Sequence, residues 1–287
     1  MVRGETMRPI LSLIIVEYFS LEAIDRCFSS FGHLRDIEYE VICVSNSVYR
    51  ASFHEEVRRR WKLAQWIFNS ANLGFAHAVN QGIAIAKGKV YFILNPDAEL
   101  TEGDYVGAVE YLLTCSDVGI LGPKVVGFDG ILQDSCRQFP SPGHMLSRAI
   151  QRVAVSGASI LEVPVSDEVV PVDWVSGAAI MIRASLVDLI GPMDSGYFMY
   201  VEDMDWCRRV WRAGYKVIYW PAITVKHTGA RSSTAAFRER ALPSRLTMIH
   251  LASYSRYVWK TWLLRPSKVV VRSEGLVRRG GEGEAVL

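Results

Sequence analysis

The chain has 287 residues, of which 50% are hydrophobic, and its 32 lysine and arginine side chains nearly balance 30 aspartate and glutamate side chains. This composition excludes a disordered or fibrous protein, and a net charge of +2 excludes the strong positive field of a general nucleic-acid binder. The length allows one large domain or two small ones with a sizeable core.

Five cysteines are scattered along the chain without a CxxC pair. This pattern indicates reduced thiols in a cytosolic protein rather than a disulfide framework or a zinc site. The apolar run at 10–16 has seven residues, too few to span a bilayer, and nowhere do eighteen apolar residues follow one another. We therefore expect a soluble or peripheral protein in the cytoplasm.

Strands and helices are predicted to alternate from residue 10 to residue 94. Apolar runs at 10–16, 39–47 and 90–94 are typical of buried strands, and a shorter strand is predicted from Ala64. Helical spacing is found at 21–31 and again in the segment that ends near Gly88. This alternation predicts βαβ units and a largely parallel sheet.

Polar residues follow several of these strands. Ser45, Asn46, Asn72 and Asp97 all fall at the carboxyl edge of the predicted sheet, where such sheets bind ligands. Asp97 ends the tripeptide Asn95-Pro96-Asp97, for which a simple turn is the structural alternative.

The second half of the sequence is less regular. Residues 117–143 are rich in Gly, Pro and Asp, and 153–171 have the composition of an exposed stretch. The segment 172–183 predicts a strand with an internal glycine, which indicates a close approach by a ligand or another strand. A helix is predicted from Glu202 to a stop at Gly214, and a strand follows, with His227 just beyond it.

Each candidate functional group also has a structural explanation. Glu202 and Asp203 would stabilise a helix N-terminus, and His227 would serve as a hydrogen-bonded turn residue. The basic side chains of the same helix are most simply a solvated face with i, i+4 partners such as Asp205; they are Arg208, Arg209 and Arg212.

Taken together, the segments 72–100, 173–183 and 196–217, followed by His227, resemble the family 2 glycosyltransferases. Within that family, they are most similar to the rhamnosyltransferase-like group that builds bacterial polysaccharides. The resemblance runs from about residue 9 to residue 233. It implies a GT-A fold, an α/β architecture with a Rossmann-like, mostly parallel sheet flanked by helices. The implied catalytic domain covers 9–235, divided into a nucleotide-binding half (9–100) and an acceptor-binding half (101–235).

The resemblance also implies residue roles in an inverting sugar transfer from a nucleoside diphosphate. Asp97 matches the last acid of a DXD-type metal motif, in which Asn95 replaces the first acid. Asp203 matches the catalytic base, with Glu202 as its neighbour or as an acceptor-orienting group. His227 matches a histidine that helps to hold the metal or the diphosphate. The loop that approaches the nucleotide is matched by Asn72 and Gly74.

The chemistry of the reaction agrees with these roles. The diphosphate leaving group develops negative charge, which a divalent cation stabilises, and Mg²⁺ or Mn²⁺ prefers oxygen ligands. His227 suits Mn²⁺ better than Mg²⁺. Inversion in one displacement requires a base that takes the proton of the acceptor hydroxyl, and Asp203 is our choice.

Two positions depart from the family pattern. Relatives usually carry NYN after the first strand and DN.S after the second, whereas this chain has EYF at 17–19 and SNS at 45–47. The acid that is missing at Ser45 normally contacts the pyrimidine base, and Glu17 adds a negative charge beside the expected nucleotide pocket. We therefore expect a shifted donor preference or weakened donor binding.

The last segment, 236–287, is predicted to be a helical, basic extension. Residues 245–279 contain eight Lys or Arg and one acid. A basic helix that carries Trp and Tyr can lie on an anionic membrane, at the inner face of the plasma membrane here; the alternative is an amphipathic helix packed on the domain. Its apolar positions at helical spacing are Leu246, Ile249, Tyr257, Val258, Trp262 and Leu263.

We therefore predict an inverting, metal-dependent glycosyltransferase. The resemblance implies dTDP-rhamnose as donor and a cell-surface polysaccharide or lipid-linked saccharide as acceptor. One alternative is a UDP-hexose donor. Another is a non-catalytic sugar-nucleotide binder, which Glu17 and Ser45 favour and the retained acids oppose. A dinucleotide oxidoreductase and a P-loop enzyme are disfavoured, because this chain has neither a GxGxxG motif after its first strand nor a GxxxxGK[ST] motif. The oligomeric state stays open.

Overall fold

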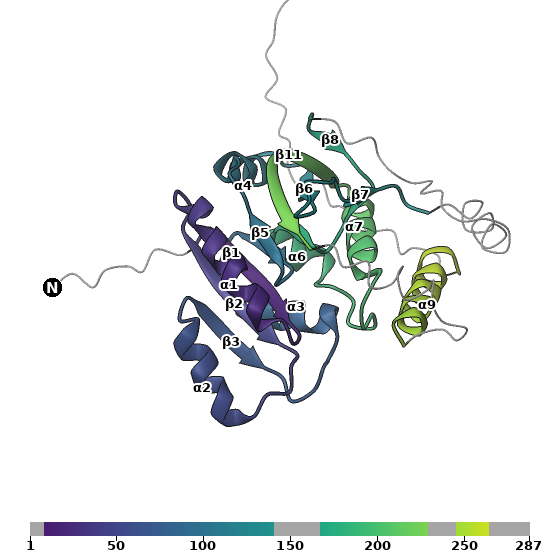
Figure 1. The fold of residues 1–287 in the computed structure, drawn as a ribbon. Coiled ribbons are helices and arrows are strands. Elements are labelled where there is room, and N and C mark those ends of the chain that lie inside the picture. Colours follow the sequence, from purple (N-terminus) through teal and green to yellow (C-terminus); the bar gives the residue numbers. More distant parts are fainter. Residues whose placement is uncertain (1–8, 141–166, 229–244, 264–287) are drawn as a thin grey trace, which may run out of the picture.

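The protein is described by a computed structural model, which covers residues 9–140, 167–228 and 245–263 (Figure 1). Its main sheet has the strand order β3-β2-β1-β4-β10-β6-β11-β5, and β8 pairs with β11. A second sheet pairs β7 (Cys136–Arg137) with β9 (Trp174–Val175). The strands of the main sheet are β1 (Leu11–Glu17), β2 (Tyr39–Ser45), β3 (Ala64–Phe68), β4 (Val90–Leu94), β5 (Ala98–Leu100), β6 (Val118–Val126), β8 (Val170–Pro171), β10 (Ala179–Arg183) and β11 (Lys216–His227).

The described helices cover both faces of this sheet, except the last one, which docks on another helix away from the sheet (Figure 1). They are α1 (Leu21–Ser29), the 3₁₀ helix η1 (Ser30–Leu34), α2 (Ala51–Arg60), α3 (Phe75–Ile85), α4 (Tyr105–Thr114), α6 (Ala184–Ile190), α7 (Glu202–Arg212) and α9 (Arg245–Val258), which continues into a π-helical turn, Trp259–Leu263.

The first four strands confirm the predicted parallel arrangement. β1 pairs in parallel with β2 and with β4, and β2 pairs in parallel with β3. Every residue of β1 is buried, because alternate side chains enter two cores. Leu13 and Ile15 pack in the core beneath α1 and α2, whereas Ile14 and Val16 pack against α3.

The rest of the sheet is mixed rather than parallel. β10 runs antiparallel to β4 and to β6, whereas β11 runs parallel to β6. β6 lies within the segment that the sequence marked as irregular, and its pairing on both sides explains why a strand forms there. Of the predicted exposed stretch 153–171, the part up to residue 166 lies outside the described residues.

Two predicted elements have different bounds. The strand predicted over 172–183 is divided into β9 and β10, and Gly177 lies in the turn between them. His227 is the last residue of β11, not a loop residue beyond it, because the strand continues through Pro221 with a register shift between Trp220 and Thr224. The predicted helix from Glu202 is confirmed as α7, and Gly214 follows it with φ +85°.

None of the described helices is both long enough and apolar enough to cross a membrane.

Candidate functional site

Glu17 lies at the carboxyl end of β1 and is completely buried. Its Oε2 accepts a 2.5 Å hydrogen bond from Ser45 Oγ. Its Oε1 accepts bonds from the backbone N–H of Ser20 (2.8 Å), Ser47 Oγ (3.1 Å) and Tyr49 OH (3.0 Å). Four donors from its own chain therefore satisfy this carboxylate, and it is not an open negative charge facing a ligand.

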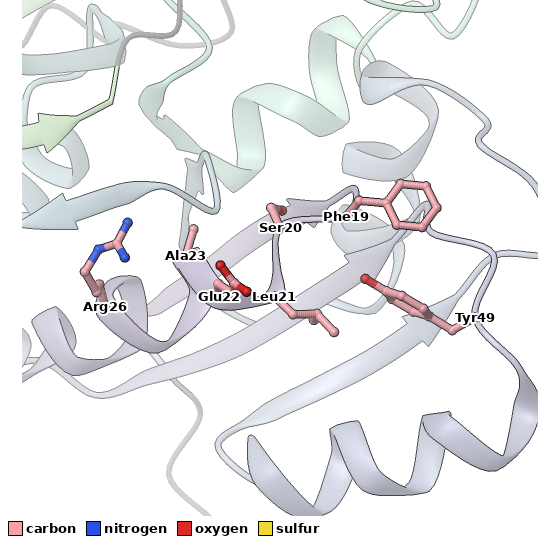
Figure 2. Close-up of a pocket in the computed structure, with 7 residues that line it drawn as sticks. All are labelled: Phe19, Ser20, Leu21, Glu22, Ala23, Arg26 and Tyr49. Atoms are coloured by element: carbon pink, nitrogen blue, oxygen red, sulfur yellow. The ribbon is translucent and has the colours of Figure 1, made fainter.

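The Glu17 network holds an aromatic rim in place. Ser47 Oγ also accepts a hydrogen bond from the backbone N–H of Phe19, which has φ +49°. The Phe19 ring meets the Tyr49 ring edge-on, with centroids 5.9 Å apart. Beside them is a cavity of about 470 Å³ (Figure 2). The residues that line it are Phe19, Ser20, Leu21, Glu22, Ala23, Arg26 and Tyr49.

The loop that begins α3 is fixed by two side-chain amides. Asn46 Nδ2 donates to the Gly74 carbonyl (3.1 Å), and Asn72 Oδ1 accepts from the Gly74 N–H (3.0 Å). Gly74 has φ +87°, and an added Cβ would lie 2.3 Å from the carbonyl oxygen of Phe198. The N–H of Phe75 donates to that same carbonyl (2.7 Å). The predicted nucleotide loop therefore contacts the segment that precedes α7, and only glycine fits there.

Asp97 and His227 lie together at the other side of this edge. His227 Nε2 is 3.3 Å from Asp97 Oδ1 and 3.0 Å from Asn95 Nδ2. Burial alone would raise the pKa of Asp97, but a hydrogen bond and Coulombic attraction from His227 lower it below the usual value. Asn95 therefore contacts the imidazole of His227 through its amide, and Asp97 provides the carboxylate beside that imidazole.

Gln133 orients this histidine, which the sequence gave no reason to expect. Its Nε2 donates to the His227 carbonyl (2.6 Å), so its Oε1 is the atom that faces His227 Nδ1 at 3.0 Å. An acceptor at Nδ1 keeps the proton there, and Nε2 is directed toward Asp97.

The pair of Asp97 and His227 fits a divalent metal. The residues described contain no group of three or more His, Cys, Asp or Glu that could hold an ion. Two protein donors, one oxygen and one imidazole nitrogen, nevertheless leave positions for water and phosphate oxygens, as Mg²⁺ and Mn²⁺ sites at nucleotides do.

Asp203 and Glu202 begin α7, and their environments differ. Asp203 Oδ2 accepts from the Gly177 N–H, and Oδ1 accepts from the Met204 N–H, both at 2.8 Å. Glu202 is 5% exposed, and its Oε2 has no hydrogen-bond partner among the described residues. Burial raises the pKa of both carboxyls, and that of Glu202 is raised well above its usual value. The two N–H donors favour the charged form of Asp203, so Asp203 is the group that ionises first.

The turn at 176–178 brings the two acidic centres to the same site. Gly177 N–H donates to Asp203, while the next carbonyl, of Ala178, accepts from the Asn95 N–H at 3.0 Å. A Cβ added at Gly177 would meet Asp203 Oδ2 and Phe75 Cε1 at 3.5 Å, an ordinary van der Waals distance, so the described neighbours leave room for a side chain and do not make the close approach predicted for this glycine.

Arg137 is a second residue that the sequence did not single out. Its guanidinium forms an ion pair with Asp134 (2.7 Å) and lies 5.1 Å from the centroid of the Trp174 ring. Its positive charge also lowers the pKa of Asp203, in opposition to burial. Arg137 belongs to the two-residue strand β7, which is too short to give a periodic signal.

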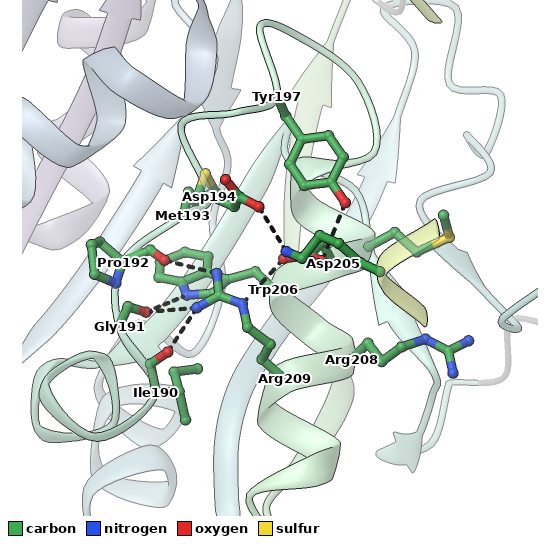
Figure 3. Close-up of polar contacts among 12 residues, drawn as sticks. Ile190, Gly191, Pro192, Met193, Asp194, Tyr197, Asp205, Trp206, Arg208 and Arg209 are labelled. Atoms are coloured by element: carbon green, nitrogen blue, oxygen red, sulfur yellow. Dashed lines mark hydrogen bonds and ion pairs between the residues drawn. The ribbon is translucent and has the colours of Figure 1, made fainter. Parts of the chain in front are cut away.

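Two of the three arginines of α7 make structural contacts within the protein, whereas Arg212 is exposed as predicted. Arg209 pairs with Asp205 at 3.1 Å and donates to the carbonyls of Ile190, Gly191 and Pro192 (Figure 3). Arg208 donates to Tyr257 OH of α9. These contacts fasten α7 to the chain before it and to α9.

The comparisons with known proteins agree with one another. The family model described as Glycosyl transferase family 2 matches residues 12–152. The N-acetylglucosaminyl-diphospho-decaprenol L-rhamnosyltransferase of Mycobacterium tuberculosis is 26% identical over 301 residues, which cover 95% of this chain and 94% of that protein. Rhamnosyltransferase WbbL of Escherichia coli is 27% identical over 205 residues, 67% of this chain and 72% of that protein.

A solved structure of GalNAc-T7 with UDP, GalNAc and Mn²⁺ has the same fold. The TM-score is 0.59 at 16% sequence identity, and the match covers 77% of this chain but only 43% of that one. The expected GT-A fold is therefore confirmed.

Proposed function

Because this chain belongs to glycosyl transferase family 2 and is a glycosyltransferase, we propose that it is an inverting, metal-dependent rhamnosyltransferase. The donor is dTDP-rhamnose, and the acceptor is a lipid-linked saccharide or a growing cell-surface polysaccharide. The names of the two rhamnosyltransferase relatives support the sugar, and the name of the mycobacterial protein supports a lipid-linked acceptor.

One observation carries the mechanism: the 176–178 turn hydrogen-bonds to Asp203 on one side and to Asn95 of the metal motif on the other. A base and a diphosphate site must face the two sides of the same anomeric carbon when inversion occurs in one displacement. This turn supplies a rigid connection of that kind.

In this mechanism, Asp203 takes the proton of the acceptor hydroxyl while the oxygen forms the new bond to the anomeric carbon. The bond to the nucleoside diphosphate breaks at the same time, and its electron pair leaves with the phosphate. Burial and the charge of Asp203 raise the pKa of Glu202, which favours its neutral form. In that form, Oε2 would donate a hydrogen bond to an acceptor or sugar oxygen and satisfy an otherwise unpartnered buried atom.

Asp97 and His227 would hold Mn²⁺ or Mg²⁺. The metal, when bound, neutralises the charge that develops on the diphosphate. His227 would bind through the Nε2 lone pair, and Gln133 at Nδ1 would keep the ring in the required orientation. The Mn²⁺ in the GalNAc-T7 structure supports a metal of this class.

The donor nucleotide occupies the edge between Phe19, Tyr49 and the Gly74 loop. The exposed Phe19 ring offers a face on which a planar base can stack. Glu17 keeps this rim in place without contacting the donor, so its charge does not argue for a closed site.

A UDP-hexose is the second candidate donor, because the GalNAc-T7 structure contains UDP. Calorimetric titration with dTDP-rhamnose, UDP-glucose and UDP-N-acetylglucosamine, each with Mn²⁺ and with chelator, separates the candidates. Preferred, metal-dependent binding of dTDP-rhamnose supports the proposal. Preference for a UDP-sugar selects the alternative, and failure to bind any donor leaves a non-catalytic protein as the better explanation.

A further inference from the structure

Helix α9 contacts the rest of the protein through its polar side. Thr247, Ser253 and Tyr257 are its buried residues. Ser253 Oγ donates to the Met199 carbonyl at 2.8 Å, and Tyr257 OH accepts from Arg208 Nε of α7 at 2.5 Å. This side therefore docks by hydrogen bonds as well as by the packing of Tyr257 against Tyr197, Val201 and Met204.

Ion pairs strengthen the same attachment. Arg256 Nη2 lies 3.0 Å from Asp194 Oδ2, and Lys260 Nζ lies 2.7 Å from it. Lys260 also bonds to Asp205 Oδ1 at 2.8 Å. Asp205 is nearly buried in α7, where Tyr197 and Arg209 hold it as well (Figure 3). The position of α9 is therefore fixed relative to the helix that begins with the proposed base.

The opposite side of α9 is apolar and faces outward. Met248 is 54% exposed, Leu251 44% and Trp259 50%. The exposed positions recur at helical spacing, three and four residues apart, so they form one continuous arc, the α9 arc: Arg245, Met248, Leu251, Ala252, Ser255 and Trp259.

A surface helix usually turns its apolar stripe toward the core and a polar face toward solvent, whereas α9 carries apolar side chains on its outward side as well. This outward side also differs from the stripe predicted from the sequence. Tyr257 of that stripe is buried against the protein, Leu246 and Ile249 are half-buried, and the side chains of Trp262 and Leu263 lie outside the described residues.

We propose that the α9 arc is the surface by which this protein docks on an anionic lipid bilayer. A helix face that carries apolar side chains and a tryptophan can insert shallowly among lipid headgroups. Residues 245–279 carry eight Lys or Arg against one acid. Asp194 pairs with two of these cations, Arg256 and Lys260. The excess of positive charge in this stretch of sequence favours anionic headgroups.

A second copy of the chain fits this arc less well. A stable protein interface buries about 800 Å² on each partner. Three half-exposed side chains on one helix offer much less, whereas shallow insertion into a bilayer needs no larger patch.

Docking through α9 would bring the active site to a membrane-borne acceptor, because α9 and α7 are joined by Arg208, Tyr257, Lys260 and Asp205. This consequence rests on the proposed function. The docking itself does not, so binding of vesicles and binding of a sugar nucleotide can succeed or fail separately.

Vesicle flotation of the full chain tests the proposal. Wild type is mixed with phosphatidylglycerol-containing vesicles or with pure phosphatidylcholine vesicles, at low and at high salt. The test variant carries Met248→Ser, Leu251→Ser and Trp259→Ser. The control carries Leu63→Ser, Ile131→Ser and Leu189→Ser, three equally exposed apolar residues on other surfaces. Circular dichroism and calorimetry verify that both variants are folded.

We expect wild type and the control to float with the anionic vesicles, more strongly at low salt, and the test variant to lose about tenfold or more of its partitioning. Wild type that stays with the soluble fraction, or a test variant that floats as wild type does, overturns the proposal. A chain that elutes as a dimer and becomes monomeric only in the test variant, with unchanged flotation, would assign the arc to a second copy instead.

Discussion

Glu17 and Ser45 face each other across the parallel pair β1 and β2, and the Ser45 hydroxyl donates to the Glu17 carboxylate at 2.5 Å. The family pattern has an acid at the end of the second strand, whereas in this chain the acid stands at the paired position of the first strand. Its contacts remain within the protein. The two departures from the pattern are therefore one feature, an acid and a hydroxyl at adjacent strand ends.

Glu17→Gln should destabilise the protein and weaken donor binding. A glutamine amide turns a donor toward hydroxyls and N–H groups that now donate to Glu17, which costs about 1–3 kcal/mol for a buried group. Urea unfolding and donor titration measure the two effects. Glu22→Gln, at an exposed position of the same cavity, is the control. In the exchange variant E17S/S45E, which keeps an acid and a hydroxyl at the register pair, part of the stability should return; a Glu17→Gln protein indistinguishable from wild type contradicts the role.

Asp203→Asn should abolish transfer while donor binding persists. Loss of a general base lowers kcat about 10²–10⁴-fold. Glu202→Gln should lower it far less, since burial raises the pKa of Glu202 and favours the neutral form that glutamine mimics. Because burial raises the pKa of Asp203 and the base acts when deprotonated, kcat should rise with pH through a pKa above the usual range of aspartate. Single-turnover rates across pH measure this, and equal losses in the two variants would contradict the assignment.

Asp97→Ala should remove the Mn²⁺-dependent part of donor binding, with a loss of about tenfold or more. Glu99→Ala is the matched control, since Glu99 lies two residues away but pairs with Arg26 at 2.7 Å. Titration with and without chelator measures both variants. If Glu99→Ala lost metal dependence and Asp97→Ala kept it, the metal would lie elsewhere.

Gly74→Ala should destabilise the protein more than Gly130→Ala. Both glycines have positive φ, +87° and +77°, so each alanine is strained by about 1 kcal/mol. Only at Gly74 would the new Cβ collide with backbone, the Phe198 carbonyl. We therefore expect a further loss of stability and weaker donor binding in Gly74→Ala. Thermal unfolding of the two variants compares the effects, and equal shifts would mean that the Gly74 loop relaxes freely.

Asp194→Asn should weaken the attachment of α9 in a pH-dependent way. Burial opposes the shift, but hydrogen bonds from Lys260, Gly196 and Arg256 lower the pKa of Asp194 to about 2. Because the pKa of Asp194 is lower in the folded protein than in the unfolded chain, its ion pairs stabilise the fold at pH values above the unfolded-state pKa. This stabilisation is lost as the pH falls toward 2. Solvent screening leaves about 1 kcal/mol of it. The stability difference between wild type and variant should therefore shrink between pH 4 and pH 2; a constant difference would exclude this ion pair as its source.

Local patterns were sufficient for much of the fold. The apolar runs of β1, β2 and β4 and the acid-first helix α7 could be predicted because strand burial and helix capping depend on residues close in sequence. β6, β7 and the division at Gly177 could not. Their formation depends on pairing with strands that are distant along the chain, and short strands carry little periodicity.

The sequence by itself determined which residues we propose to carry the chemistry: Asp97, Asp203 and His227 were singled out by the resemblance of their segments to the family. Only the tertiary structure decided what surrounds them. It gave Gln133 to His227, the Gly177 N–H to Asp203, and four internal donors to Glu17. It also turned the apolar side of α9 outward. These partners are separated by tens of residues, and hydrogen bonds and burial depend on distance in space, which residue order alone does not specify.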